Sequence, residues 1–380
     1  MEQYQRHLKI WRLLYKLLHW PFERIFSMTH EDIEVEGPCI IISNHVNMWD
    51  PILVALSMEK KHAYFVASEH LFRKGLRTKL LNYLLAPISR KKASVGSDTV
   101  KACLRHLKAG HSICLFGEGE ASWNGVNKPI FPATGKMVKA SGASLVTYRL
   151  EGGYMIRPRW AKHIRKGKMH GHPVNIYSPE QLAKMTPQEI NDRINADIYE
   201  DAWARQKAEQ VRFTGRRRAE GIEKALFLCP KCRKIGSLKG VDDRVTCSCG
   251  YETVFTETGF FDPPEPFENI YQWDVWQHKE LKGRRFEPGE GEALFSDAHI
   301  KLAKIDQNHH EQTVCVGTLT QYEGMLRCGD VEFALDDISK MDMVQTHMLL
   351  FQTGGDYYEL LALRPANMRK YLAMFKERQK

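Results

Sequence analysis

The sequence of 380 residues lacks any long apolar run. None approaches the roughly 18 apolar residues that a helix needs to cross a bilayer. We expect no secretory leader, because Arg12 and Lys16 interrupt the first apolar stretch and no small-residue cleavage site follows it. Internal repeats and low-complexity tracts are also absent. We therefore expect a protein of the cytoplasmic side that lies on a membrane at most.

The composition is that of a folded chain, with 43% hydrophobic and 27% charged residues. Its length favours two or three structural units. The net charge of +9 suits anionic partners such as phospholipid headgroups, coenzyme phosphates or nucleic acid. Charge alone does not choose among these partners, and a solvated basic surface without any specific partner gives the same balance.

The first segment, residues 3–20, has the periodicity of an amphipathic helix that ends at Pro21. Its apolar positions recur at steps of three and four residues: Tyr4, Leu8, Trp11, Tyr15 and Leu18. A basic face opposite aromatic and aliphatic side chains suits a helix that lies in a membrane interface. An ordinary helix that packs on a domain is an equally good interpretation.

Short apolar runs alternate with helical patterns from about residue 39 to residue 210. Residues 39–43, 63–67 and 113–116 are strand-like, and residues 97–109 are typical of a helix that Gly110 ends. This alternation predicts an α/β fold with a mostly parallel sheet and flanking helices. The charged stretch 205–224 has few apolar residues and is the expected domain boundary.

A histidine and an aspartate lie where the first buried run ends. The strand-like run stops at Ser43, and Asp50 followed by Pro51 suits the start of a helix, so His45 falls on the turn between them. Loops at the carboxyl ends of strands carry the chemistry of α/β sheets. A neutral imidazole can take a proton from a hydroxyl, and a carboxylate can fix its tautomer. A surface histidine beside a capping aspartate is the plain alternative.

A glycine-rich segment follows the apolar run 113–116, and it reads Gly117, Glu118, Gly119, Glu120, Ala121, Ser122. Glycines allow the backbone to approach a ligand, and their amides can face a phosphate or an oxyanion. Glu118 can accept a hydrogen bond from a substrate or brace the loop. An ordinary turn would have the same composition.

Together these motifs resemble the glycerolipid acyltransferase family, which includes the 1-acylglycerol-3-phosphate O-acyltransferases. The resemblance covers residues 25–205, where Asn44, His45 and Asp50 match the family's Asn-His-four-residues-Asp motif. Phe116, Glu118, Gly119 and Ser122 match its Phe-Pro-Glu-Gly-Thr-Arg-Ser block, and residues 87–90 take the place of its Phe-Ile-Asp-Arg segment. Gly117, Glu120 and Ala121 depart from the block, so the arginine that family members point at the acceptor phosphate is missing.

This resemblance implies direct transfer of a fatty acyl group from acyl-CoA or acyl carrier protein to a lysophospholipid, first of all 1-acylglycerol-3-phosphate, in phospholipid biosynthesis. His45 would be the general base, and Asp50 would orient it. The implied substrate-binding residues are Asn44, Arg90, Glu118, Gly119, Ser122, Lys136 and Arg149. Either Arg90, Lys136 or Arg149 would supply the missing charge, or the acceptor would be something other than lysophosphatidic acid. From the amphipathic first segment and the basic balance we also expect a peripheral position on the cytoplasmic side of a membrane with anionic phospholipid.

Four cysteines form two close pairs, Cys229 with Cys232 and Cys247 with Cys249. Four thiolates at this spacing suit tetrahedral zinc, and a site closed by four protein ligands is structural. The segment resembles a zinc ribbon. A disulfide pair or unligated cysteines are the alternatives.

The expected units are an interfacial helix (1–28), an acyltransferase domain (29–210), a zinc ribbon (226–255) and an accessory α+β domain (256–380). The last unit has strand-like residues 317–320, 326–334 and 348–351 and a final helical pattern over 365–378, an order that resembles a pleckstrin-homology-like domain. Two hypotheses compete with the enzyme: a non-catalytic lipid-binding scaffold and a nucleic-acid-binding zinc-ribbon protein. We expect no nucleic acid partner, because nucleic acid binding would leave the ordered acyltransferase motifs unexplained.

Overall fold

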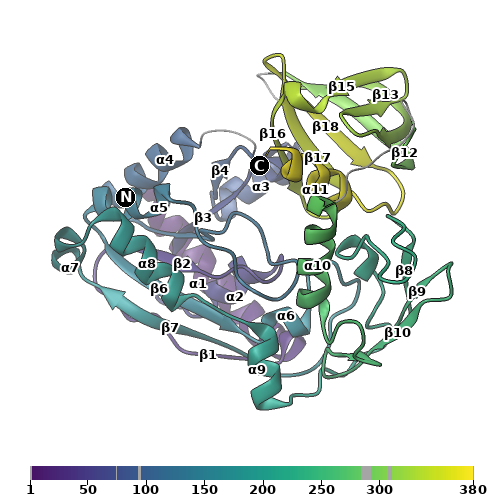
Figure 1. Ribbon diagram of the computed structural model, residues 1–380. Coiled ribbons are helices and arrows are strands. Elements are labelled where there is room, and N and C mark those ends of the chain that lie inside the picture. Colours follow the sequence, from purple (N-terminus) through teal and green to yellow (C-terminus); the bar gives the residue numbers. More distant parts are fainter. Residues whose placement is uncertain (1, 74, 93–95, 284–291, 307–309, 380) are drawn as a thin grey trace.

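Three β-sheets organise the described part of the chain (Figure 1). The computed structural model describes residues 2–73, 75–92, 96–283, 292–306 and 310–379. Within these ranges a seven-stranded sheet is followed by a four-stranded sheet and then by a second seven-stranded sheet. The three sheets follow one another along the chain in the order that the sequence predicts.

The first sheet is mixed but mostly parallel, as the alternating pattern predicts. Its strands are β1 (Met28–His30), β2 (Cys39–Ser43), β3 (Ala63–Ser68), β4 (Ile88–Arg90), β5 (Ser112–Leu115), β6 (Ser144–Glu151) and β7 (Met169–Tyr177). They run in the order β1-β7-β6-β2-β5-β3-β4, and only the β6–β7 pair is antiparallel. Strand β2 lies in the middle and is buried throughout, which explains its unbroken apolar sequence.

Helices cover both faces of this sheet. They are α1 (Glu2–Phe26), α2 (Asp50–Ala55), α3 (Leu76–Leu84), α4 (Ser97–Lys108), α5 (Ala133–Ser141), α6 (Gly153–Ile156), α7 (Pro179–Lys184), α8 (Pro187–Asp197) and α9 (Ala202–Glu209). Ile41 of β2 packs in one core with α1, α2 and α6, whereas Ile40 and Ile42 pack in another with α4, α5 and α8. Alternate residues of the strand thus serve opposite faces. The expected helix over 97–109 is confirmed as α4, and Gly110 follows it with φ +81°.

Helix α1 ends later than the sequence predicts. It continues through Pro21 to Phe26, although proline cannot donate the hydrogen bond to the carbonyl four residues earlier. The rings of Phe22 and Phe26 lie 5.6 Å and 6.3 Å from the ring of Trp49. This aromatic packing holds the last turns against the domain and outweighs the missing bond.

The same helix also divides its apolar residues between two faces. Trp11 is buried and donates from Nε1 to the Met58 carbonyl at 2.7 Å, so the face expected to enter a membrane packs on the domain instead. A different stripe, formed by Leu13, Leu17 and Trp20, is about 60% exposed. Across the described ranges, no helix combines the length and the apolar character needed to span a bilayer.

The second sheet is small and antiparallel. Its strands are β8 (Leu238–Val241), β9 (Arg244–Cys247), β10 (Glu252–Phe255) and β11 (Phe261–Asp262), in the order β11-β10-β9-β8. Helix α10 (Ile270–Gly283) follows and leads to the third sheet. Trp273 of α10 donates from Nε1 to the Leu228 carbonyl at 2.9 Å, which fastens this helix to the cysteine-bearing segment.

The third sheet is fully antiparallel and precedes the last helix, α11 (Arg369–Arg378). Its strands are β12 (Phe295–Ile305), β13 (Glu311–Gln321), β14 (Met325–Cys328), β15 (Val331–Ala334), β16 (Ile338–Val344), β17 (Met348–Thr353) and β18 (Asp356–Ala362), in the order β15-β14-β13-β12-β18-β17-β16. A separate antiparallel domain with a final helix is confirmed. The expectation of one strand over 326–334 is wrong, because Gly329 at φ +59° turns the chain into a hairpin.

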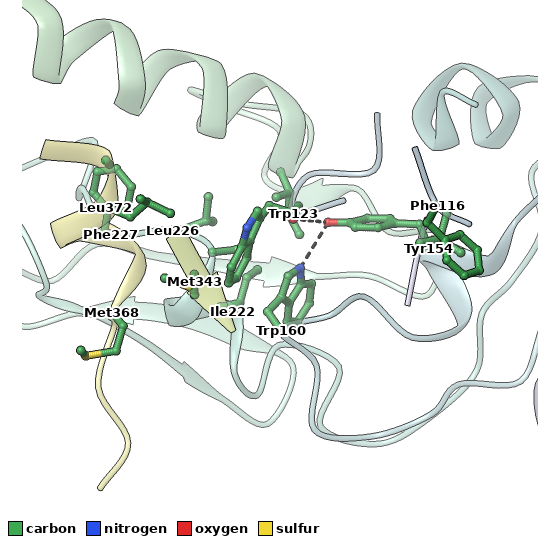
Figure 2. Packing of buried hydrophobic residues seen from close by; sticks show 14 of the residues in the cluster. Phe116, Trp123, Tyr154, Trp160, Ile222, Leu226, Phe227, Met343, Met368 and Leu372 are labelled. Atoms are coloured by element: carbon green, nitrogen blue, oxygen red, sulfur yellow. Dashed lines mark hydrogen bonds between the residues drawn. The ribbon is translucent and has the colours of Figure 1, made fainter. Parts of the chain in front are cut away.

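The C-terminal sheet domain (residues 295–378) shares a hydrophobic core with the rest of the chain (Figure 2). Met343 of β16 and Leu372 of α11 belong to the same buried cluster as Trp123 and Phe227. Figure 2 shows these side chains on one side of Trp160 and Tyr154, and Tyr154 Oη donates to the Trp123 carbonyl at 3.0 Å. The units expected from the sequence are therefore packed together.

A cluster of histidines and tyrosines joins α1 to the amino ends of β3 and β5. The Tyr64 ring lies 4.9 Å from the His62 ring and 4.2 Å from the His106 ring, and Tyr64 Oη is 3.1 Å from His7 Nδ1. Burial lowers the pKa of His7, His62 and His106, and it lowers that of His62 to about 4. These imidazole rings are therefore neutral at pH 7. The packing of α1 against the sheet depends on this neutral form.

We expect the protein to lose stability as the pH falls from 6.5 towards 4. In this range the unfolded chain binds a proton at His62 more readily than the folded chain does, so the free energy of unfolding falls. His62 alone should cost about 2 kcal/mol at pH 5. Urea unfolding at pH 7.5 and pH 5 should show a smaller loss for His62→Phe than for the wild type. His310→Phe, at an exposed position, is the control and should lose as much stability as the wild type. If the free energy of unfolding falls equally in His62→Phe and in the wild type, His62 is not the group responsible.

Candidate active site

The turn between β2 and α2 carries His45 and Asp50. Strand β2 ends at Ser43, and α2 begins at Asp50. Parallel pairing with β5 and β6 places the carboxyl ends of all three strands at one edge of the sheet. The Glu-Gly loop (residues 117–127) follows β5 at this edge, so the two sequence motifs meet there as expected.

His45 and Asp50 form a direct hydrogen bond. His45 Nδ1 lies 2.7 Å from Asp50 Oδ2, which also accepts from the amides of Val46 at 2.6 Å and Asn47 at 2.9 Å. The Asp50 side chain is fully buried, whereas the His45 side chain is 20% exposed. A carboxylate that accepts from Nδ1 leaves the lone pair of Nε2 on the open side of the ring. This arrangement can accept a proton from a bound hydroxyl.

Asp50 has a different local role from the expected helix cap. The cap position is Trp49, without a side-chain hydrogen bond, and Asp50 is the first helical residue. Its carboxylate turns back to the loop because His45 and two amides offer it three hydrogen bonds there. Burial raises the pKa of Asp50, while His45 and the amides of Asn47 and Val46 lower it and offset part of that effect.

The Glu-Gly loop is tied to the histidine turn through Glu118. Glu118 Oε1 accepts from the His45 amide at 2.8 Å and from Asn127 Nδ2 at 2.5 Å, and Oε2 accepts from the Lys128 amide at 3.0 Å. Ser122 donates its amide to the His45 carbonyl at 2.9 Å. Burial raises the pKa of Glu118 to about 7, although these donors lower it in part. Glu118 was expected either to accept a hydrogen bond from a substrate or to brace the loop. These contacts brace the loop.

Arg90 lies directly beside Gly119. A Cβ built on Gly119 would be 3.3 Å from Arg90 Nη1 and would collide with Phe131, and the backbone there has φ +78°. Both facts require glycine. The guanidinium of Arg90 stacks on the Phe131 ring at 4.6 Å. The predicted phosphate-binding arginine and the predicted acceptor loop are therefore in contact.

The other predicted substrate-binding residues have internal contacts or lie at the surface. Buried Asn44 uses both ends of its amide on Leu150 of β6, with distances of 2.9 Å and 2.7 Å. Ser122 Oγ donates to the Val126 carbonyl at 3.0 Å, and Arg149 Nε donates to the Asp197 carbonyl at 2.8 Å. Lys136 is exposed on α5. These contacts position the loops, and ligand binding by these residues stays a prediction.

The structure adds a cation that the sequence did not indicate. Arg159 Nη1 donates to Glu120 Oε2 at 2.9 Å and to the Ala121 carbonyl at 2.8 Å, and its guanidinium stacks on Trp123 at 3.9 Å. It reaches the part of the loop where the resembled family has its arginine. Because Arg159 lies about forty residues further along the chain and has no recognisable motif, only the fold could reveal it.

The four predicted metal ligands gather at one point. The sulfur atoms of Cys229, Cys232, Cys247 and Cys249 all lie within 4.8 Å of one another. The Sγ atoms of Cys229 and Cys249 are 3.7 Å apart, and those of Cys232 and Cys247 are 3.8 Å apart. Tetrahedral zinc with Zn–S bonds of about 2.3 Å separates its sulfurs by about 3.8 Å. The cluster therefore fits one tetrahedral metal ion.

Comparison with known proteins connects the site to a family. Residues 24–151 match the family model described as Acyltransferase. A comparison with curated proteins found no match. Among solved structures, the crystal structure of the 1-acyl-sn-glycerophosphate (LPA) acyltransferase PlsC from Thermotoga maritima is similar, with 17% sequence identity, 55% of this chain and 81% of that chain covered, and a TM-score of 0.40.

The matched range covers about a third of the chain and includes His45, Asp50, Arg90 and the whole Glu-Gly loop. The second and third sheets lie outside it. The part of the chain that builds the candidate active site thus matches the acyltransferase family model over residues 24–151.

Proposed function

We propose that the protein is an O-acyltransferase that moves a fatty acyl group from acyl-CoA or acyl carrier protein to the hydroxyl of a lysophospholipid, with 1-acylglycerol-3-phosphate as the first acceptor to test. The observation that carries this proposal is the 2.7 Å hydrogen bond between His45 and buried Asp50 at the strand edge of the acyltransferase domain. Phospholipid biosynthesis is the process that such a reaction serves.

The proposed step is a direct transfer. His45 Nε2 takes the proton as the acceptor oxygen attacks the carbonyl carbon of the thioester. The imidazolium that forms is stabilised by the carboxylate of Asp50, which holds Nδ1. When the C–S bond of the tetrahedral intermediate breaks, His45 returns the proton to the leaving sulfur. One ester and one thiol result, and the enzyme side chains are restored.

An exposed apolar stripe on α1 supports the proposal of a membrane partner. Leu13, Leu17 and Trp20 follow one another at steps of four and three residues, and each is about 60% exposed. Lys9, Arg12 and Lys16 are exposed on the same helix, and Arg6 stacks on Tyr83 of α3 at 4.7 Å. Helix α3 itself exposes Leu76 and Leu80. Apolar side chains beside cations suit an anionic membrane interface, so we propose that α1 and α3 dock the enzyme on its lipid substrate.

The cysteine cluster is proposed to hold structural zinc. All four ligands come from the protein, which leaves no open position for a substrate. When bound, zinc would link the segment before β8 to the end of β9.

We expect His45→Ala to lower acyl transfer at least about a hundredfold, because general-base catalysis of this kind contributes factors of 10² to 10⁴. The assay is thiol release from acyl-CoA and acyl carrier protein donors with lysophosphatidic acid and other lysolipids as acceptors. His310→Ala, at an exposed position, is the matched control. Lipid binding without acceptor-dependent release in any wild-type reaction would favour the non-catalytic scaffold.

We expect the double variant Leu17→Asp, Trp20→Asp to sediment poorly with vesicles that contain anionic phospholipid. These side chains are exposed, so the change should remove membrane contact and leave the fold intact. Deleting residues 1–20 would be a poorer test, because Trp11 is part of the core. Val314→Asp, Val316→Asp on the third sheet is the matched control. Unchanged sedimentation of the α1 variant would refute docking through α1.

We expect about one zinc ion per chain by elemental analysis of protein made in zinc-containing medium. Cys232→Ser should lose most of this metal, and it should also lower the urea concentration of half-unfolding, since binding of a structural metal contributes to folding. Cys315→Ser, outside the cluster, should keep the metal. Metal-free wild-type protein with an unchanged unfolding midpoint in chelator would rule out a structural zinc site.

A further inference from the structure

The Glu-Gly loop contacts the C-terminal sheet domain and α10. Trp123 lies in the shared core near Met343 and Leu372 (Figure 2). The guanidinium of Arg369 on α11 stacks on the Trp123 ring at 4.9 Å, and Asn124 Nδ2 donates to Asp274 Oδ2 on α10 at 2.8 Å. One wall of the proposed acceptor site therefore borders a domain that the family match does not include.

Six cationic side chains surround this contact, and we call them the interdomain cation cluster. They are Arg90, Lys92, Lys128 and Arg159 from the acyltransferase domain and Arg369 and Lys376 from α11. The acidic side chains that pair with them are Glu120, Asp274 and Asp342. The cluster thus carries more positive charge than the neighbouring acids neutralise.

The ion pairs show which cations of the cluster have an acidic partner and which do not. Glu120 forms ion pairs with Lys128 at 2.5 Å and with Arg159 at 2.9 Å. Asp274 forms an ion pair with Arg369 at 2.6 Å, and Asp342 lies 3.6 Å from Lys92. Within the described ranges, neither Arg90 nor Lys376 has an acidic side chain at ion-pair distance. These two cations come from different domains.

Lys376 is on the same face of α11 as Arg369. Seven residues make almost two full helical turns, so the side chains of residues 369 and 376 point in the same direction. Arg369 faces Trp123, and Lys376 therefore also faces the Glu-Gly loop. Lys376 is exposed, and the charges of Glu120 and Asp342 both act on it. It is a solvent-accessible cation at the border of the loop.

Loss of solvation is only partly compensated in this cluster. Burial lowers the pKa of Arg90, and nearby Asp342 does not offset it. Burial likewise lowers the pKa of Lys92, and the pull of Asp342 and Glu120 is insufficient to offset it. Burial raises the pKa of Glu120, but Lys128, Arg159 and Lys376 hold it well below its usual range. An additional anion would stabilise the cluster.

We propose that α11 completes an anion-binding site at the Glu-Gly loop, in which Arg90 and Lys376 together bind the phosphate of the acyl acceptor. This inference rests on the proposed function, because the loop belongs to the site that contains His45. A phosphomonoester carries a charge near −2 and three acceptor oxygens, which match a guanidinium and an ammonium that approach from two sides. The C-terminal sheet domain is then part of the acceptor site, and the bound phosphate links it to the acyltransferase domain.

The kinetic test compares Lys376→Gln with Arg378→Gln. Arg378 is on the same helix, but its guanidinium is paired with Asp336 at 2.6 Å, away from the loop. Lys376→Gln should raise the KM for lysophosphatidic acid about tenfold, the effect of one charge-assisted hydrogen bond. Its kcat and its KM for the acyl donor should stay within about twofold of the wild type. Transfer to monoacylglycerol, which has no phosphate, should be the same in all three proteins.

A binding test does not depend on turnover. Calorimetry on the full chain should detect glycerol 3-phosphate, and Lys376→Gln should weaken this binding about tenfold while Arg378→Gln leaves it unchanged. Inorganic phosphate is the second probe and should bind more weakly, since it lacks the glycerol. Lys376-dependent binding without acyl transfer would preserve the anion site and reject the proposed reaction.

Three results would overturn the inference. The first is equal KM values for lysophosphatidic acid in Lys376→Gln and the wild type. The second is glycerol 3-phosphate binding that does not depend on Lys376, or no binding at all. The third is inorganic phosphate that binds as tightly as glycerol 3-phosphate, because the site would then serve free phosphate and not the acceptor. Equal urea midpoints of Lys376→Gln and Arg378→Gln establish that folding is not the cause.

Discussion

The buried carboxylate of Asp50 is the constraint on which the candidate active site depends. A charge without solvent must find hydrogen bonds, and Asp50 Oδ2 finds three of them in the five residues that precede it. They fold the turn after β2 back on itself and leave Nε2 of His45 on the open side. The His45 backbone then extends the network, since its amide donates to Glu118 and its carbonyl accepts from Ser122. The orientation of the His45 ring and the position of the Glu-Gly loop therefore have a single origin.

The Glu-Gly loop of the candidate site depends on parts of the chain that are far apart in sequence. Trp123 stacks with Arg159 of the acyltransferase domain and with Arg369 of α11, and Arg159 Nη2 donates to the Gln345 carbonyl at 2.7 Å. The contacts of Trp123 with Arg369 and of Arg159 with Gln345 cross a boundary between the expected units. A chain with this core cannot move the C-terminal sheet domain without disturbing the Glu-Gly loop, so the domain is better regarded as a component of the site than as an appendage.

The sequence predicted what local pattern and spacing determine. The buried run of β2, the helix of α4 with its terminal glycine, the pairing of His45 with Asp50 and the closeness of the four cysteines all follow from short segments. Three expectations failed where distant contacts decide: Trp49 holds α1 beyond Pro21, loop amides draw Asp50 away from capping, and Gly329 splits one expected strand. Arg159 and Lys376 could not be found because no local pattern marks a residue that meets its partners only after folding.

The cysteine cluster has a physical route to the acceptor loop. The segment just before Cys229 is held by α10 and α11, because the Phe227 amide donates to Gln277 at 2.9 Å and the Ala225 carbonyl accepts from Arg369 at 2.7 Å. Arg369 is also the residue that stacks on Trp123 and pairs with Asp274. Order at the four thiols therefore stabilises the position of Arg369, and Arg369 in turn stabilises one wall of the site. A structural metal in this protein would support the candidate site at a distance through the packing of two helices.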